Sequence, residues 1–148
     1  MPKAKISLQE ITEDTLSEIL NLEVTEQQKR FIASNEKSIA QAHFSNYSWF
    51  RAIYADNTPV GFVMLYLEPE KPVYEIWRFM IDEKHQRKGY GKEAMKQCID
   101  FVKSLPYSQE LFLSMVPENG TAAAFCNSMN FIYTGEWHGN EKIMKLEL

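Results

Sequence analysis

The stretch Gln86-Arg87-Lys88-Gly89-Tyr90-Gly91-Lys92 separates two apolar patterns of different period. Residues 73–81 (VYEIWRFMI) precede it and are rich in β-branched and aromatic side chains, which is typical of a buried strand. After it, apolar residues recur at helical spacing and predict a helix that begins near Gly91, with one apolar face formed by Met95, Cys98, Ile99, Val102 and Leu105. The sequence therefore predicts a glycine-containing turn between a strand and a helix.

This turn has the features of an anion-binding site. Gly89 and Gly91 permit positive φ angles and close backbone approach, so that successive N–H groups can converge on phosphate oxygens. The start of the helix adds unpaired N–H groups and the positive end of the helix dipole. Basic side chains surround the same place: Arg87, Lys88 and Lys92. A solvated strand-to-helix turn is the alternative explanation.

Two other phosphate-binding loops are excluded by spacing. The P-loop pattern GxxxxGK[ST] does not occur, and the dinucleotide fingerprint GxGxxG would need a glycine where the chain has Ala94. Further along, residues 111–116 (LFLSMV) predict a second buried strand, followed by the turn 117–120 (PENG). A short helix then carries Ala122 and Phe125 on one face, Asn130 ends it in a left-handed conformation, and residues 131–137 predict another strand.

The remaining sequence completes a mixed α/β chain. Residues 5–8 predict a short strand, and Thr12 caps a helix that carries Leu16, Ile19, Leu20 and Val24. The capping box Thr25-x-x-Gln28 predicts a second helix through about Gln41. Hairpins are predicted for residues 49–55 with 60–67, and for 131–137 with 142–146 around a turn at 138–140. The predicted order is β-α-α-β-β-β-α-β-α-β-β.

Two motifs carry a resemblance to a known family. The pattern Gln-x-x-Gly-x-Gly at residues 86–91 resembles the pyrophosphate loop of the GNAT superfamily of acyl-CoA N-acyltransferases. Residues 119–131, Asn-x-x-Ala-x-x-Phe-Cys-x-x-x-Asn-Phe, resemble the second GNAT signature. The resemblance covers essentially the whole chain and implies the GNAT fold: a mixed, mostly antiparallel sheet of about six to seven strands flanked by four helices, in one domain over residues 1–148.

Composition limits the function classes. With 148 residues, 45% of them hydrophobic and 24% charged, the chain has enough apolar sequence for one core. No run is long enough to span a bilayer and no charged-then-apolar leader opens the chain, so a cytoplasmic location is expected. The net charge of -4 argues against nucleic acid, and the two cysteines and three histidines show no metal-ligand spacing. The expected cysteine state is a buried free thiol.

The resemblance implies that acetyl-CoA is the cosubstrate. In the family, the main chain of the strand before the pyrophosphate loop holds the pantetheine, which here implies backbone roles for Phe79, Met80 and Ile81. The resemblance assigns the pyrophosphate to the loop residues Gln86, Arg87, Lys88, Gly89, Tyr90, Gly91 and Lys92. The second signature implies cosubstrate contacts from Asn119 and Phe125, although Asn119 can also serve as a helix cap.

Acetyl transfer to an amine needs a neutral nucleophile. A primary amine with a pKa of ~10.4 is protonated at neutral pH, and its deprotonation costs about 4–5 kcal/mol. A carboxylate is the expected base, and Glu75 shares side-chain parity with Trp77 and Phe79 on the strand where many GNAT enzymes place theirs. A solvated carboxylate near the strand start is the alternative for Glu75. Trp77 cannot act as a base and is either a pocket wall or core.

The proton donor departs from the family pattern. Cys126 occupies the position where the family commonly has a Tyr that protonates the leaving sulfur. The leaving thiol resembles cysteine, with a pKa of ~8.5, and therefore departs readily as a thiolate. Cys126, water and Tyr133 of the following strand remain alternatives for the donor.

Three segments, 24–35, 77–82 and 139–144, resemble bacterial spermine/spermidine (diamine) N-acetyltransferases. Such an acceptor calls for carboxylates and aromatic faces. The candidates for acceptor binding are Glu26, Trp49, Tyr66 and Trp77, with Glu23, Glu36 and Glu75 as further carboxylates. Solvated helix surface is the alternative for the carboxylates on the first two predicted helices.

Other functions remain open at this point. The acceptor can be an aminoglycoside, an amino acid or a protein N-terminus, and a non-catalytic acyl-CoA sensor is the alternative from a different class. An exposed apolar C-terminal hairpin with Ile143, Met144 and Leu146 predicts a homodimer that shares a sheet.

Overall fold

The protein forms one seven-stranded sheet with helices on both faces. The structure, a computed structural model, describes residues 3–70 and 73–148. The strands are β1 (Ile6–Gln9), β2 (Ser48–Ala55), β3 (Thr58–Glu68), β4 (Val73–Ile81), β5 (Glu110–Met115), β6 (Ile132–His138) and β7 (Glu141–Glu147). The helices are α1 (Leu16–Leu20), α2 (Asn35–His43), α3 (Tyr90–Lys103) and α4 (Gly120–Ser128), with short 3-10 turns at Gln28–Arg30 and Glu83–His85.

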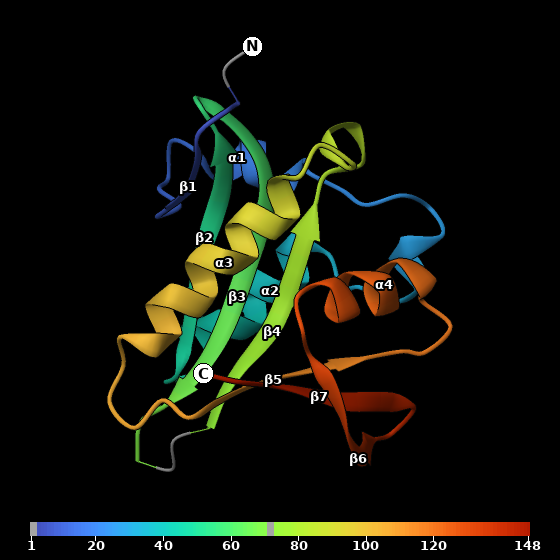
Figure 1. The fold of residues 1–148 in the computed structure, drawn as a ribbon. Helices are drawn as coiled ribbons and strands as arrows, with labels where there is room; N and C mark the ends of the chain where they lie inside the picture. The colour runs from blue at the N-terminus through green and yellow to red at the C-terminus, as the bar shows by residue number, and fades with distance from the viewer. Residues whose placement is uncertain (1–2, 71–72) are drawn as a thin grey trace.

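The sheet is mixed and mostly antiparallel, which confirms the predicted fold class. Its strand order is β1-β2-β3-β4-β5-β7-β6, and β4 pairs with β5 in parallel while the other neighbouring pairs are antiparallel. α3 makes the crossover between β4 and β5 (Figure 1). β4, α3 and β5 therefore form a β-α-β unit with parallel strands.

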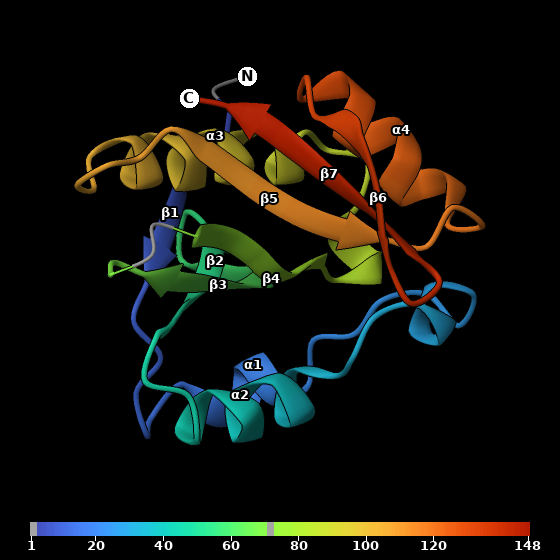
Figure 2. The same cartoon turned by 90° about the horizontal axis from the view of Figure 1, so that it is seen from below.

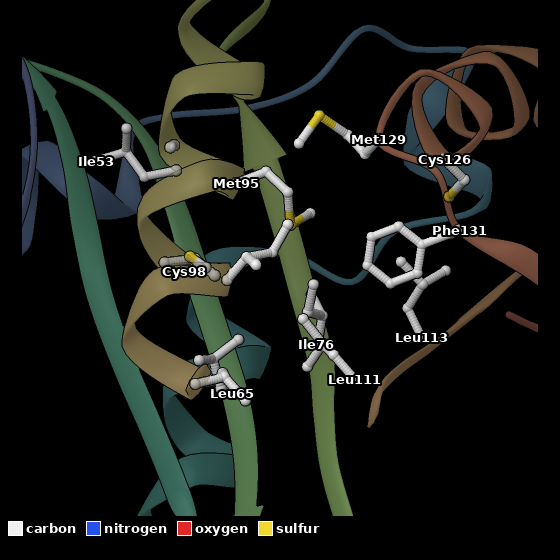
Figure 3. Close-up of a cluster of buried hydrophobic side chains, with 14 of the residues drawn as sticks. Ile53, Leu65, Ile76, Met95, Cys98, Leu111, Leu113, Cys126, Met129 and Phe131 are labelled. Carbon is white, nitrogen blue, oxygen red and sulfur yellow. The ribbon is translucent and has the colours of Figure 1, made fainter. Parts of the chain in front are cut away.

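Helices cover the two faces of the sheet unequally. α3 and α4 lie over one face, and α1 and α2 lie over the other (Figure 2). The larger core lies on the α3 side, where α3 buries Met95, Cys98 and Val102 against the sheet (Figure 3). A smaller core on the α1/α2 side includes Ile19, Phe62 and Met64. The apolar periodicity predicted for α3 is confirmed, although Leu105 lies just beyond the helix end.

β4 and β5 pair only over their first halves. The parallel register runs from Tyr74↔Leu111 to Ile76↔Leu113, and no further pair between these strands occurs in the described residues. A β-bulge precedes the separation, because Leu65 pairs with Ile76 while the adjacent Met64 pairs with Arg78, which leaves Trp77 unmatched. β5 then diverges from β4 (Figure 2), which leaves one edge of the β4 backbone open from Trp77 onward.

The first two helices differ from the prediction. α1 begins after Thr15 rather than Thr12, and it ends before Val24. The capping box forms, with the Thr25 N–H donating to Gln28 Oε1 at 3.2 Å, yet it supports only the 3-10 turn Gln28–Arg30. α2 begins independently after Ser34, whose side chain accepts from the Lys37 N–H. A single cap contributes too little to propagate a helix when tertiary contacts fix the chain path.

The C-terminal hairpin also differs from the prediction. β7 lies between β5 and β6, so the free edge of the sheet is β6 and not β7. Met144 is 8% exposed because it packs into the larger core, whereas the exposed apolar side chains of the hairpin are those of Ile132, Tyr133 and Trp137. The expected exposed apolar face on Ile143, Met144 and Leu146 is therefore wrong.

Gly61 of β3 allows the close approach of β4. A Cβ atom at this position would lie 2.4 Å from the Met80 carbonyl oxygen and 2.9 Å from Ile81 Cδ1. We expect Gly61→Ala to lower the free energy of unfolding by about 1–3 kcal/mol, measured by urea denaturation, because the two strands must separate. Gly120→Ala is the matched control, since no atom lies within 4 Å of its added Cβ. Equal stability of the two variants would contradict this packing.

Candidate active site

A cleft of about 810 Å³ opens where β4 and β5 separate. Its floor includes the β4 main chain from Ile76 to Ile81, and its other walls come from the end of β5, α4, the loop before α3 and the segment between α1 and α2. The cleft thus collects elements from all parts of the chain. It brings together residues of both sequence motifs, which are separated by the whole of α3 and β5.

The loop before α3 has the backbone conformation of an anion-binding turn. Gly89 caps α3 with a φ of 84°, and Arg87 also has a positive φ, of 64°. Gly89 has the positive φ that both glycines permit, whereas Gly91 lies inside α3, where an added Cβ would contact Phe125 and Ile81 at 3.5 and 3.6 Å. The N-terminus of α3 faces the cleft beside exposed Arg87 and Lys92 side chains. This arrangement can bind a diphosphate through N–H groups and positive charge.

α4 adds a second helix N-terminus to the same cleft. Asn119 caps it, since its buried side chain accepts from the Ala122 N–H at 3.3 Å. The predicted cap role is therefore confirmed, and Asn130 ends the helix with a φ of 70°, as expected. Phe125 of α4 stacks on Phe79 of β4, with ring centroids 5.6 Å apart, and this pair joins the two walls of the cleft.

Cys126 lines the cleft but belongs to the larger core. The side chain is buried beside Phe131 (Figure 3). Burial raises the pKa of the Cys126 thiol to about 11. The thiol is therefore protonated at neutral pH and is a weaker acid than a solvated thiol.

A second charged part of the cleft, which we call its acidic end, is lined by Arg78 and Glu141, and Glu75 lies near them without lining the cleft. Glu75 is half-buried, and burial raises the pKa of its carboxyl group, as does nearby Glu141, while His138 and Arg78 act in the opposite direction. Glu141 begins β7 and lines the cleft, and sequence reasoning missed it. The sequence feature that could have indicated Glu141 was its place in segment 139–144, which resembles the polyamine acetyltransferases. These carboxylates make this end suitable for an ammonium group.

Arg78 separates this acidic group from α2. Its guanidinium donates to the Gln41 side chain at 2.9 Å and to the Trp77 carbonyl at 2.9 Å. Burial lowers the pKa of Arg78, while Glu141 and Glu75 oppose that shift. Arg78 is thus a cationic side chain of β4 that lies close enough to Glu75 to interact with its carboxylate.

The bulge at Trp77 changes the predicted parity of β4. Glu75 and Trp77 share the α1/α2 face, whereas Phe79 packs on the α3 side with Ile76. The expectation that Glu75 and Phe79 point in the same direction is therefore wrong, because the unmatched residue shifts the alternation by one.

The structure brings one of the four acceptor-binding candidates into the described cleft wall. Trp77 lines the cleft and contacts Tyr66 edge-on, with ring centroids 6.2 Å apart. Tyr66 lies behind it and donates to Glu68. Trp49 stacks on Phe101 on the α3 side, away from the cleft lining.

The remaining carboxylates from the first two predicted helices lie outside this acidic end. Glu26 is exposed and forms an ion pair with Lys29 at 2.7 Å. Glu23 pairs with the same lysine at 3.2 Å. Glu36 lies exposed on α2. All three positions fit solvated surface better than the cleft wall.

Comparison with known proteins identifies the family. The model of the acetyltransferase (GNAT) family matches residues 9–131. The chain belongs to the GNAT acetyltransferase family. The match includes β4, the loop 86–92 and α4, so it spans both walls of the cleft. GNAT acetyltransferases use acetyl-CoA as cosubstrate, and the diphosphate-binding geometry of the loop fits that molecule.

One curated protein and two solved structures illustrate what the chain is similar to over nearly its whole length. The chain is 31% identical to the spermine/spermidine N(1)-acetyltransferase of Bacillus subtilis (strain 168), over 97% of this chain and 99% of that protein. Among solved structures it is similar to spermidine N-acetyltransferase from Vibrio cholerae in complex with CoA and spermine, with a TM-score of 0.75, 17% identity and coverage of 96% and 95%. The PaiA N-acetyltransferase from Thermoplasma acidophilum in complex with coenzyme A has a TM-score of 0.76, 17% identity and coverage of 97% and 99%.

Two kinds of feature, a membrane-spanning helix and a metal-binding cluster, are absent from the part of the chain that the structure describes. No helix among residues 3–70 and 73–148 is long and apolar enough to cross a membrane. The same residues contain no group of three or more His, Cys, Asp and Glu side chains that could hold a metal ion.

Proposed function

We propose that the chain, as one domain over residues 1–148, transfers an acetyl group from acetyl-CoA to a primary amine of spermine, spermidine or a related diamine. The observation that carries the proposal is the end-to-end similarity to the Bacillus subtilis spermine/spermidine N(1)-acetyltransferase. The cleft supports it, because the glycine-containing loop before α3 and the Glu141 carboxylate both line it, with Glu75 close to Glu141.

The cosubstrate binds along the open edge of β4. The loop residues 86–92 and the N-terminus of α3 hold the pyrophosphate. The pantetheine lies between the separated strands, where the main chain of Phe79, Met80 and Ile81 provides hydrogen-bonding groups. Asn119 and Phe125 contact it from α4. A β4 amide that faces the thioester oxygen stabilises the negative charge that develops there.

The acceptor amine approaches from the acidic end of the cleft. Its ammonium group loses one proton to Glu75, directly or through water, and the nitrogen lone pair attacks the thioester carbonyl carbon. A C–N bond forms, the C–S bond breaks, and coenzyme A leaves as the thiolate. The second proton of the attacking nitrogen is released, and the thiolate takes up one proton. Glu141 and Trp77 bind a second ammonium group of the acceptor by ion pairing and cation–π contact.

Water protonates the leaving thiolate in this proposal. The leaving thiol, with a pKa of ~8.5, departs as a thiolate that needs no internal donor and takes its proton from solvent afterwards. Cys126 is buried in the core, and its pKa of about 11 makes it a weaker donor than a solvated thiol. We expect Cys126→Ala to change kcat by less than about twofold, while the free energy of unfolding falls because a buried side chain is shortened. Thiol-release assays measure kcat, and chemical denaturation measures the free energy of unfolding. A tenfold or larger fall in kcat would assign the proton transfer to Cys126.

We also propose a cytoplasmic homodimer. The exposed edge strand β6 carries three exposed apolar side chains, Ile132, Tyr133 and Trp137, so a shared sheet would extend from β6. A twofold-related pairing of this edge would cover them. Light scattering measures the mass, and a monomer at micromolar concentration would contradict the dimer.

Thiol release from acetyl-CoA is the first test of the function. Spermine, spermidine and putrescine are compared with lysine, an aminoglycoside and a peptide with a free N-terminus. Release with the polyamines alone supports the proposal. Release with another amine would change the acceptor class, and acetyl-CoA binding without release for any amine would favour the sensor alternative.

A further inference from the structure

The wall of the cleft between α1 and α2 is an irregular segment. Its residues 24–33 form no helix or strand apart from the short 3-10 turn Gln28–Arg30. It lines the cleft with Val24, Thr25, Gln27, Gln28, Phe31, Ile32 and Ala33. We refer to residues 24–33 as the acceptor segment, because it forms the wall beside the β4 residues Trp77 and Arg78.

One end of the acceptor segment is fixed to the connection between β4 and α3. Asp82 is 6% exposed, and its Oδ1 accepts from the Glu23 N–H at 2.9 Å. The Glu83 N–H donates to the Glu23 carbonyl at 2.9 Å. The second Asp82 oxygen accepts from the Lys84 N–H at 3.2 Å. This attachment is independent of the side chains further along the segment.

A second attachment joins the middle of the segment to the pyrophosphate loop itself. Gln86 Nε2 donates to Gln28 Oε1 at 2.9 Å and to the Ile81 carbonyl at 2.9 Å. The reverse contact, from Gln28 Nε2 to Gln86 Oε1, is 3.4 Å. Thr25 orients Gln28, since the Gln28 N–H donates to Thr25 Oγ1 at 3.3 Å and the Thr25 N–H donates to Gln28 Oε1. The capping box that fails to start a helix thus holds Gln28 against Gln86.

Gln86 is the first residue of the loop that holds the pyrophosphate. Arg87 follows it directly with a positive φ, so the position of the Gln86 side chain depends on the conformation of the loop.

We infer that the Gln28–Gln86 amide pair couples cosubstrate binding to the ordering of the acceptor wall, and that Gln28 is a positioning residue for the acceptor. The inference rests on the proposed placement of the pyrophosphate at residues 86–92. Linkage requires the coupling to be reciprocal: CoA raises acceptor affinity by the same factor by which the acceptor raises CoA affinity. The coupling needs no contact between CoA and the acceptor, because it acts through the pyrophosphate loop and the acceptor segment.

Hydrogen exchange with CoA alone tests the coupling without an acceptor. Two amides report on the segment: the Lys29 N–H, bonded to the Thr25 carbonyl at 3.0 Å, and the Phe31 N–H, bonded to the Gln28 carbonyl at 2.9 Å. In the native chain, saturating CoA is expected to slow their exchange about fivefold or more. In Gln28→Leu the slowing is expected to vanish, while CoA affinity by calorimetry falls by no more than the coupling factor.

Thr25→Val is the matched control. It removes the hydroxyl that accepts from the Gln28 N–H and loosens the turn locally. The main-chain N–H at position 25 still donates to Gln28 Oε1, so the Gln28–Gln86 contact is kept. We expect the exchange of its reporter amides to remain sensitive to CoA. Equal slowing in native chain and Gln28→Leu would overturn the inference, as would a native segment that does not respond to bound CoA.

A second measurement separates this inference from the proposed function. Spermine affinity is measured with and without saturating CoA in the native chain and in Gln28→Leu. An affinity ratio that falls toward one in the variant supports the coupling. Spermine that binds neither form contradicts the proposed acceptor, and the CoA exchange experiment still decides the coupling. CoA that fails to bind the native chain would overturn both the pyrophosphate placement and the coupling.

Discussion

Gly89→Asp is expected to lower the affinity for acetyl-CoA by about 30-fold or more, equivalent to about 2 kcal/mol, without unfolding the protein. Gly89 caps α3 with a φ of 84°, at the point where the pyrophosphate is proposed to bind. An added Cβ meets no atom within 4 Å, so the side chain has room, and the strain of a side chain at this positive φ is shared with the control variant described next. The Asp carboxylate, however, lies against the anionic cosubstrate. Isothermal titration with CoA measures the loss.

Gly89→Asn is the control that isolates the charge. Asn and Asp have the same shape, and both tolerate a left-handed backbone better than other non-glycine residues do. We expect Gly89→Asn to bind CoA within about threefold of the native chain, because it adds no repulsion. A carboxylate at the start of α3 interacts favourably with the helix dipole, so the Asp variant should be at least as stable as the Asn variant. Equal CoA affinity of the two variants would contradict the site.

The difference between the two variants should also depend on salt. The repulsion between a partly exposed carboxylate and the pyrophosphate is screened at high ionic strength, where the Debye length is about 3 Å at 1 M. The affinity gap should therefore narrow between 0.05 and about 1 M salt. A gap that salt leaves unchanged would contradict charge repulsion as its cause, because the two variants have the same shape and share any backbone strain.

The two motifs could be predicted from the sequence because their residue types follow from local backbone requirements. A turn that presents N–H groups to phosphate needs glycine at Gly89, and a helix that starts at the cleft needs a cap such as Asn119. Both features depend on only a few neighbouring residues. The pattern of the buried face of α3 was predictable for the same reason, since its period is local.

The shape of the cleft could not be predicted, because it depends on pairing between distant strands. The bulge at Trp77 arises only when β4 meets β3, and nothing in residues 73–81 marks the unmatched position. The strand alternation inferred from sequence therefore holds up to Trp77 and is reversed at Phe79. Glu141 was missed for a related reason: it reaches the cleft only because the β6–β7 hairpin folds back beside β5.

The acceptor segment shows a correct local prediction with a wrong consequence. Thr25 and Gln28 form the predicted capping box, but the helix does not follow. Tertiary bonds from Glu23 to Asp82 and from Gln28 to Gln86 fix the path of the chain. They outweigh the helix propensity of the segment, which is a weak preference per residue.

The second large effect is expected at Glu75. Glu75→Gln should lower kcat/KM for spermine about 100-fold, because the amine loses its base. Acetyl-CoA affinity should be unchanged, since Glu75 lies in the first half of β4, where this strand still pairs with β5, and not beside the loop 86–92. Glu141→Gln is the matched comparison: it also removes one negative charge, and we expect it to raise KM for spermine with a smaller change in kcat. Equal effects of the two variants on kcat would contradict a base role for Glu75.

The raised pKa of Glu75 predicts opposite effects of Glu75→Gln on activity and stability. Burial disfavours the ionised form in the folded state, so ionised Glu75 reduces stability as pH rises through its raised pKa. At neutral pH the Gln variant should therefore have a Tm at least as high as that of the native chain, by calorimetry. The difference in Tm should shrink toward pH 4, where the native carboxyl group is protonated.

The pH dependence of activity tests the same group. Native kcat/KM should fall as pH drops through the raised pKa of Glu75, and this fall should be absent from the pH profile of the variant. A variant that loses both activity and stability at neutral pH would instead assign Glu75 a structural role, because the neutral amide would then fail to replace the carboxylate in the fold itself.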